Sequence, residues 1–170
     1  MKTWETLYDT KNITKLTYCG MLIGLSAIGS MIKISGSIAF DSMPGFFAAL
    51  FLGPWAGAVV AGLGHLLTAL TSGFPLTLPM HLVLVLEMGL FAYLFGIIYR
   101  KRGSIVASIV AIILNGPVAS LFAVPMSIVL GLPFSGWPLF SVVILPLTLA
   151  SIGNVVLALS VFKVINKRIR

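Results

Sequence analysis

Four side chains that form strong hydrogen bonds lie within long apolar stretches of this sequence. A charged group at the centre of a bilayer costs about 2.5–3.5 kcal/mol even on a lenient insertion scale, so such groups face a bundle interior or a cavity. At similar depth on four helices they could line one cavity and bind a small polar molecule. Alternatively, each bonds a neighbouring helix, which is worth about 0.6–2 kcal/mol. The four are Glu87, His65, Asn115 and Asn154.

Two further residues add candidate chemistry near the same stretches. His81 precedes Glu87 by six positions, which is about 240° around a helix, so the two do not share one face. One could lie at the mouth of a pocket and the other in its floor, or His81 could simply be an interfacial histidine. Trp137 either belongs to an interfacial aromatic belt or stacks as a lid over a ring.

Enzyme and metal signatures are missing from the sequence. It contains neither the phosphate-binding pattern G-x-x-x-x-G-K-[ST] nor the zinc pattern H-E-x-x-H, and G-x-S-x-G is absent. Cys19 is the single cysteine, which excludes an internal disulfide and a cysteine-based metal cluster. We therefore expect no catalytic residue and no metal site. The alternative is a small intramembrane enzyme that uses Glu87 and a histidine as acid and base.

Composition places these residues in a membrane protein. Hydrophobic residues make up 59% of the 170 residues and charged residues only 9%, whereas soluble domains carry about 25% charged residues. The net charge of +7 comes from basic residues that flank apolar stretches. Anionic lipid headgroups are the natural partners of such flanks, and we expect no nucleic-acid binding.

The basic residues also predict the topology. Ten of the eleven lysines and arginines form three clusters, and such clusters mark the cytoplasmic ends of membrane spans. An even number of spans must then separate neighbouring clusters, with both termini in the cytoplasm. The clusters are Lys2, Lys11 and Lys15; Arg100, Lys101 and Arg102; and Lys163, Lys167, Arg168 and Arg170.

Six spans satisfy this rule, and together they predict an all-α membrane protein. A crossing helix needs about 20 apolar residues, so the second span is only half the usual length. External loops are expected at 33–42, 73–79 and 131–140, and prolines predict a kink or break in the fifth span. The spans are residues 14–32, 43–52, 55–72, 80–99, 104–130 and 141–165.

Small residues recur at a spacing of four in the first span. Gly20 and Gly24 form one pair and Ser26 and Ser30 another. Small residues at this spacing let another helix approach closely. The face could serve packing within the chain or docking of a partner.

The stretch 41–57, DSMPGFFAALFLGPWAG, resembles a signature of the substrate-binding S components of energy-coupling factor (ECF) transporters. Those proteins show an acid and a proline after the first external loop, then an apolar run, then Leu-Gly-Pro-x-x-Gly. Chain length, six spans and cytoplasmic termini agree, so the resemblance covers the whole of 1–170 as a single integral-membrane substrate-binding domain.

The resemblance implies a function without chemistry. An S component binds a vitamin or vitamin precursor in an outward-facing pocket and docks to a membrane coupling subunit that carries two ATPases. It would need no cofactor of its own, since the partner ATPases use the ATP, and it would be a multi-pass protein of the bacterial inner membrane. Carried over, it implicates small residues of the first span in docking. For the pocket it implicates His81, Glu87, Asn115, Trp137 and Asn154, with Asp41 and Thr77 in the gates.

The cargo is suggested by one further segment. Residues 65–69 (HLLTA) followed by 73–81 (GFPLTLPMH) are most similar to members assigned to α-ribazole, a benzimidazole riboside used in cobalamin salvage. Apolar walls would take the ring, and a carboxylate with amides would bond the ribose hydroxyls. An anionic cargo fits less well, because Lys33 is the one basic residue near the outer half. Pantothenate, riboflavin or a similar vitamin is the alternative.

Overall fold

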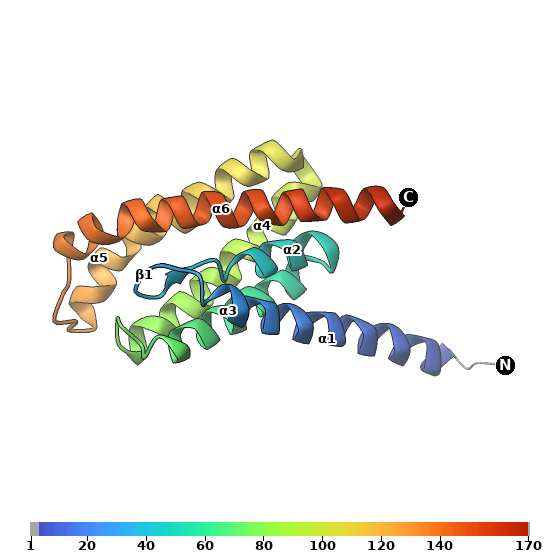
Figure 1. The fold of residues 1–170 in the computed structure, drawn as a ribbon, viewed down its shortest axis with the longest axis horizontal. Coiled ribbons are helices and arrows are strands. Elements are labelled where there is room, and N and C mark those ends of the chain that lie inside the picture. Colours follow the sequence, from blue (N-terminus) through green and yellow to red (C-terminus); the bar gives the residue numbers. More distant parts are fainter. Residues whose placement is uncertain (1–3, 170) are drawn as a thin grey trace.

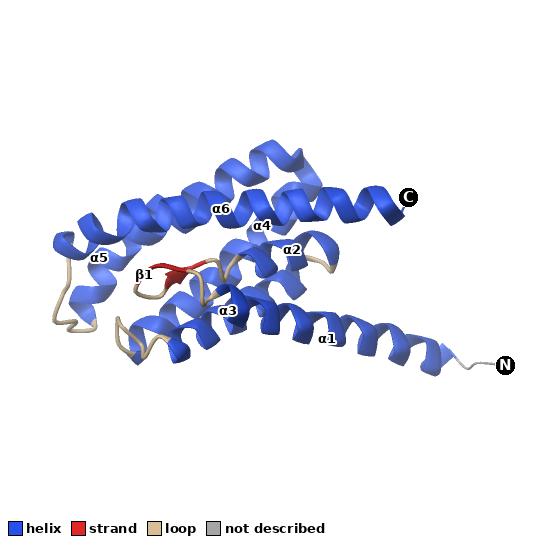
Figure 2. Cartoon of the chain, viewed as in Figure 1, coloured by secondary structure: helices blue, strands red, loops and turns tan. Residues whose placement is uncertain are grey.

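In the computed structural model the backbone is described for residues 4–169 and the side chains for residues 12–168. The described chain is helical apart from short loops and one two-stranded ribbon (Figure 1; Figure 2). Lys2, Arg170 and the side chain of Lys11, which the topology prediction used, lie outside these residues. The elements in order are α1 (Trp4–Gly29), β1 (Lys33–Ser35), β2 (Ile38–Ala39), α2 (Met43–Phe51), α3 (Pro54–Thr71), α4 (Leu78–Ile113), η1 (Leu114–Val118), α5 (Ala119–Val129) and α6 (Trp137–Ile169).

Helix α4 contains a reversal of the chain. Gly103 has φ 79° and ψ −179°, a conformation that glycine adopts without the steric cost that a side chain brings. Figure 1 shows the chain turning back at this point and returning alongside itself through η1 and α5. The Arg100–Arg102 cluster therefore lies at a turn between two antiparallel segments, as the charge pattern predicts.

Both described ends of the chain lie at the same end of the molecule (Figure 1). The turns after α2 and at Gly103 lie there too, while the ribbon and the loops before α4 and α6 lie at the opposite end. Within the described residues, three helices are long and apolar enough to cross a membrane: Pro54–Thr71, Leu78–Val129 and Trp137–Arg168. Six spans with cytoplasmic termini remain a prediction, because α2 is only nine residues long and α1 is not among the three.

The short helix α2 is wrapped by protein. Its residues from Pro44 to Leu50 are all buried, and Phe46 packs edge-on against Phe95 of α4 with ring centroids 5.2 Å apart. At Gly45 an added Cβ would lie 2.6 Å from the Ala61 Cβ on α3, closer than real Cβ atoms come. Burial inside the bundle explains how an apolar helix of half the usual length is stabilised.

Three details refine the sequence-based prediction. The first predicted external loop contains the β1–β2 ribbon, whose pairing satisfies backbone groups in that segment. In the fifth span, where a kink or break was predicted, a π-helical turn that contains Pro117 interrupts the α-helix, while Pro125 lies inside α5. Helix α6 begins at Trp137 instead of 141, and Pro138 suits that first turn because its missing N–H would have no helical partner there. Trp137 is thus a helical residue and not part of a loop.

Candidate functional site

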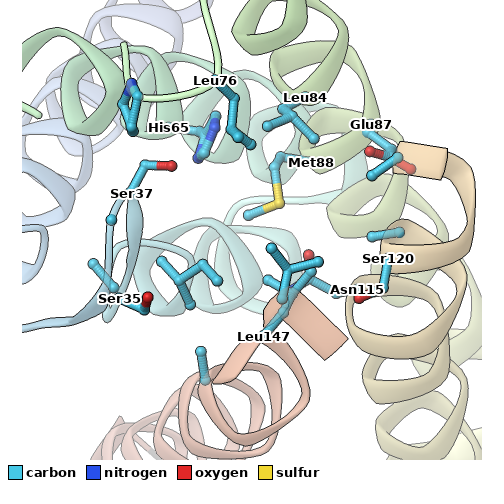
Figure 3. A pocket seen from close by; sticks show the side chains of 18 of the residues that line it. Ser35, Ser37, His65, Leu76, Leu84, Glu87, Met88, Asn115, Ser120 and Leu147 are labelled. Atoms are coloured by element: carbon cyan, nitrogen blue, oxygen red, sulfur yellow. The ribbon is translucent and has the colours of Figure 1, made fainter. Parts of the chain in front are cut away.

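A cavity of about 240 Å³ opens among the ribbon, α4, η1, α5 and α6 (Figure 3). Its wall is mostly apolar, with leucines, valines, alanines and two methionines. The described residues on this wall include two acids and no lysine or arginine. Five predicted site residues, which are far apart in the sequence, lie on it together: Asp41, His65, Glu87, Asn115 and Asn154.

Glu87 lies on the wall as a half-buried residue of α4, close to Leu84 and Met88 (Figure 3). Within the part of the chain that the structure describes, no hydrogen bond or ion pair is formed by its carboxylate. The carboxylate is therefore free to accept hydrogen bonds from a molecule in the cavity, and an ionised group in apolar surroundings needs such a partner. The position agrees with the prediction that Glu87 faces a cavity.

Asn115 presents a second unpaired acceptor. Its Nδ2 donates to the Ser151 Oγ at 3.0 Å, whereas its buried Oδ1 has no partner in the described structure. A buried acceptor without a hydrogen bond costs about 1–3 kcal/mol, and Asn115 also lines the cavity. The π-helical turn that carries it contains Pro117, and such turns occur often at functional sites.

Asn154 lines the same cavity but all its polar atoms are used within the protein. Its Oδ1 accepts the Met43 N–H at 2.8 Å, and its Nδ2 donates to the carbonyls of Ala39 and Ala150 at 3.1 and 2.9 Å. These bonds hold the end of β2 and the start of α2 against α6. The structure therefore favours the helix-bonding interpretation for Asn154, because both amide N–H groups and the amide oxygen have partners within the protein.

Asp41, His65 and His81 form a buried chain. His65 Nδ1 lies 3.3 Å from Asp41 Oδ2, and His65 Nε2 lies 3.3 Å from His81 Nδ1. His81 Nε2 in turn lies 3.5 Å from the Leu76 N–H. His81 is completely buried and does not line the cavity, so it is not placed to contact a ligand directly, contrary to its predicted position.

Besides His81, two further predicted residues are not brought to the cavity. Trp137 is 65% exposed and packs edge-on against Phe140, so the structure gives no support to a stacking lid. Thr77 is exposed, and its neighbours Pro75 and Leu76 line the cavity in its place. The sequence prediction also missed polar wall residues. These are Ser35, Ser37, Ser42 and Ser120, whose small hydroxyls gave no signal distinct from ordinary helix and loop serines.

The two small-residue pairs of α1 differ in exposure. An added Cβ would meet nothing within 4 Å at Gly20 or Gly24, and both are exposed. Ser26 and Ser30 are buried instead, and the Ser26 Oγ donates to the Asp41 carbonyl. The inclusion of Ser26 and Ser30 in a docking face is therefore corrected: this pair packs within the chain, because neither side chain reaches the surface.

An exposed apolar groove continues the Gly20–Gly24 face. It has a volume of about 740 Å³, and the stacked rings of Phe47 and Phe51 form part of it. Other lining residues come from α1 and from the end of α6: Tyr18, Met21, Leu22, Gly24, Leu25, Ile28 and Ile165.

A mostly apolar cavity with a few convergent polar groups, inside a bundle of apolar helices, has the usual form of a small-molecule site in a membrane protein. The family model described as "ECF transporter, substrate-specific component" matches residues 14–166, so the chain belongs to this family. It is therefore a membrane-associated transport subunit that acts on a small molecule within an ECF transporter complex. Neither the curated proteins nor the solved structures include a match.

Proposed function

We propose that this chain captures a neutral or cationic ring compound, with α-ribazole as the best candidate, for ATP-driven uptake across the bacterial inner membrane. The observation that carries the proposal is one cavity holding two unpaired acceptors, the Glu87 carboxylate and the Asn115 Oδ1, on a wall whose described residues include no lysine or arginine. Such a site binds hydrogen-bond donors and positive charge in preference to anions.

The size and lining of the cavity narrow the class of cargo. About 240 Å³ lies just below the ~300–1,000 Å³ usual for ligand pockets, so a compact ligand is favoured. The apolar wall suits a fused ring, and hydroxyl groups on a sugar would donate to Glu87 and Asn115. The carboxylate of pantothenate would instead lie near Asp41 and Glu87 without a counter-charge, and riboflavin is a larger molecule.

We assign the other steps of the transport cycle to partner proteins. The exposed face at Gly20 and Gly24, with the adjoining groove, would receive a membrane coupling subunit, and two ATPases bound to that subunit would hydrolyse ATP. On this proposal the chain itself needs neither a cofactor nor a metal ion. Glu87 bonds to neither histidine, which disfavours the alternative of an acid–base pair in an enzyme.

Native mass spectrometry of the purified protein, followed by titration with α-ribazole, riboflavin and pantothenate, tests the proposal. We expect a saturable isotherm for α-ribazole, tighter than for the other two compounds, and recovery of the ligand with its mass unchanged. Absence of binding by all three compounds, with no co-purified small molecule, would contradict it. A product of altered mass would favour the enzyme alternative.

A further inference from the structure

The two buried histidines connect two segments that line the cavity. Asp41 follows the β1–β2 ribbon, and Leu76 belongs to the loop between α3 and α4; both line the cavity. Between them lie His65 of α3 and His81 of α4, whose rings are 5.5 Å apart. Figure 3 shows His65 and Leu76 at the same side of the cavity.

The donor and the acceptor in each of these hydrogen bonds follow from the groups at the two ends of the series, the Leu76 N–H and the Asp41 carboxylate. The Leu76 N–H can only donate, so His81 Nε2 must accept and the proton of that ring must lie on Nδ1. That proton then faces His65 Nε2, which must accept as well. The proton of His65 therefore also lies on Nδ1, where it meets the Asp41 carboxylate. One tautomer of each neutral ring thus satisfies all three links.

The loop that His81 contacts, residues 73–77, has a strained backbone. Phe74 has φ 51° and Thr77 has φ 70°, and side-chain-bearing residues rarely adopt positive φ. Residues in such strained conformations persist only where surrounding contacts hold them. His81 supplies such contacts from α4: its Nε2 faces the Leu76 N–H, and its ring packs against Phe74 with centroids 5.7 Å apart.

We propose that His65 and His81 are positioning residues that latch the 73–77 loop to Asp41, so that these two segments of the cavity wall move together. The latch would hold Pro75, Leu76 and Asp41 in place on the cavity wall. Hydrogen bonds in series polarise one another, so a break at one link weakens the hold at the others. The consequence for cargo entry rests on the proposed function, but the latch itself does not.

The tautomers give a first test that needs no variant. The chain contains only two histidines, so ¹⁵N-histidine labelling reports on these two rings alone. Proton–nitrogen correlation spectra of the full-length protein in nanodiscs at neutral pH should show both rings protonated at Nδ1 and free of a proton at Nε2. A proton on Nε2 of either ring would overturn the proposal, because the series of hydrogen bonds from Leu76 to Asp41 would then be interrupted.

Amide hydrogen exchange of the 73–77 loop tests the latch itself, with no ligand present. His65→Asn keeps a donor for Asp41 but removes the acceptor that faces His81. His81→Gln keeps an acceptor near Leu76 but removes the donor to His65. Both variants interrupt the chain away from the loop, so we expect loop exchange to rise about three- to tenfold, the loss of one hydrogen bond.

Thr68→Val is the matched control. Thr68 is buried one turn beyond His65 on α3, but its Oγ1 donates only to the Gly64 carbonyl, so loop exchange should stay at the wild-type rate. Wild-type exchange in both histidine variants, or an equal rise in Thr68→Val, would overturn the latch. That result would leave cargo binding untouched, whereas failure of the binding titrations would leave these exchange rates unchanged.

Discussion

Asn115 and Asn154 are the same residue type on facing helices, yet their amides have different tasks. Asn154 forms three hydrogen bonds to backbone groups of Ala39, Met43 and Ala150, while Asn115 forms one and leaves Oδ1 free beside the cavity. In the sequence, the two residues are of the same type and lie at similar depth in their predicted spans. Only the positions of the neighbouring groups separate an amide that is fully engaged within the protein from one whose oxygen is free to bond a ligand.

The two amides should therefore respond differently to the same substitution. Asn154→Leu leaves the Met43 N–H and the Ala39 carbonyl unpaired and should lower the free energy of unfolding by at least about 2 kcal/mol. Asn115→Leu removes an acceptor that is already unpaired, so it should weaken α-ribazole binding with a smaller loss of stability. Denaturation in detergent and binding isotherms measure the two effects; equal stability losses would contradict the distinction.

Glu87→Gln tests the unpaired carboxylate. The substitution keeps the shape of the side chain but removes its charge, and hydrogen bonds to charged groups contribute about 1.5–3 kcal/mol. We expect binding of α-ribazole to weaken about ten- to a hundredfold, as measured by isothermal titration. Ser160→Ala, at an exposed site on α6, is the control and should bind like the wild type. Unchanged affinity in Glu87→Gln would place the ligand elsewhere.

At the scale of elements, α2 and α3 pack closely because small residues lie where their backbones meet. Gly45 of α2 lies against Ala61 of α3, and Gly57 of α3 lies against Ala49 of α2. The Arg100 Nη1 also donates to the carbonyls of Ala49 and Gly96, which ties the end of α2 to α4. A nine-residue helix is too short to be stable alone, so these contacts are what keep α2 in place.

Adding a side chain at this contact should be costly. Gly57→Val forces new atoms into the backbone of Ala49, and overpacking of this kind typically costs about 1–3 kcal/mol. The same change at Gly24, where a Cβ meets open space, should leave the unfolding temperature close to that of the wild type. Thermal unfolding followed by circular dichroism compares the pair. Equal effects would mean that α2 and α3 do not pack as described.

At the scale of the whole molecule, the proposed cargo site and the proposed docking face occupy different places. The cavity lies among the ribbon, α4, η1, α5 and α6, while the apolar groove lies on α1, α2 and the end of α6. This separation predicts variants that lose one activity and keep the other.

Gly24→Leu tests that separation. The bulky side chain should prevent close approach of a coupling subunit and reduce its recovery in a pull-down several-fold, with α-ribazole affinity unchanged. Ser26→Leu is not an equivalent test, because Ser26 is buried inside the chain and the substitution would disturb folding. Undiminished recovery of the coupling subunit with Gly24→Leu would exclude this face as the docking surface.

The sequence by itself determined the helical membrane class, five of the six helix positions to within a few residues, the family, and Glu87 as a cavity-facing acid. These follow from hydropathy, charge placement and a local motif, which are properties of consecutive residues. Tertiary structure decided the hydrogen-bond partners: Asn154 bonds a backbone 115 positions away, and His81 bonds His65 behind the cavity wall instead of lining the cavity itself. Tertiary structure also buried Ser26 and Ser30 and left Trp137 outside the cavity. A side chain's partner depends on which helices approach and at what rotation, and a single sequence does not encode that in any local pattern.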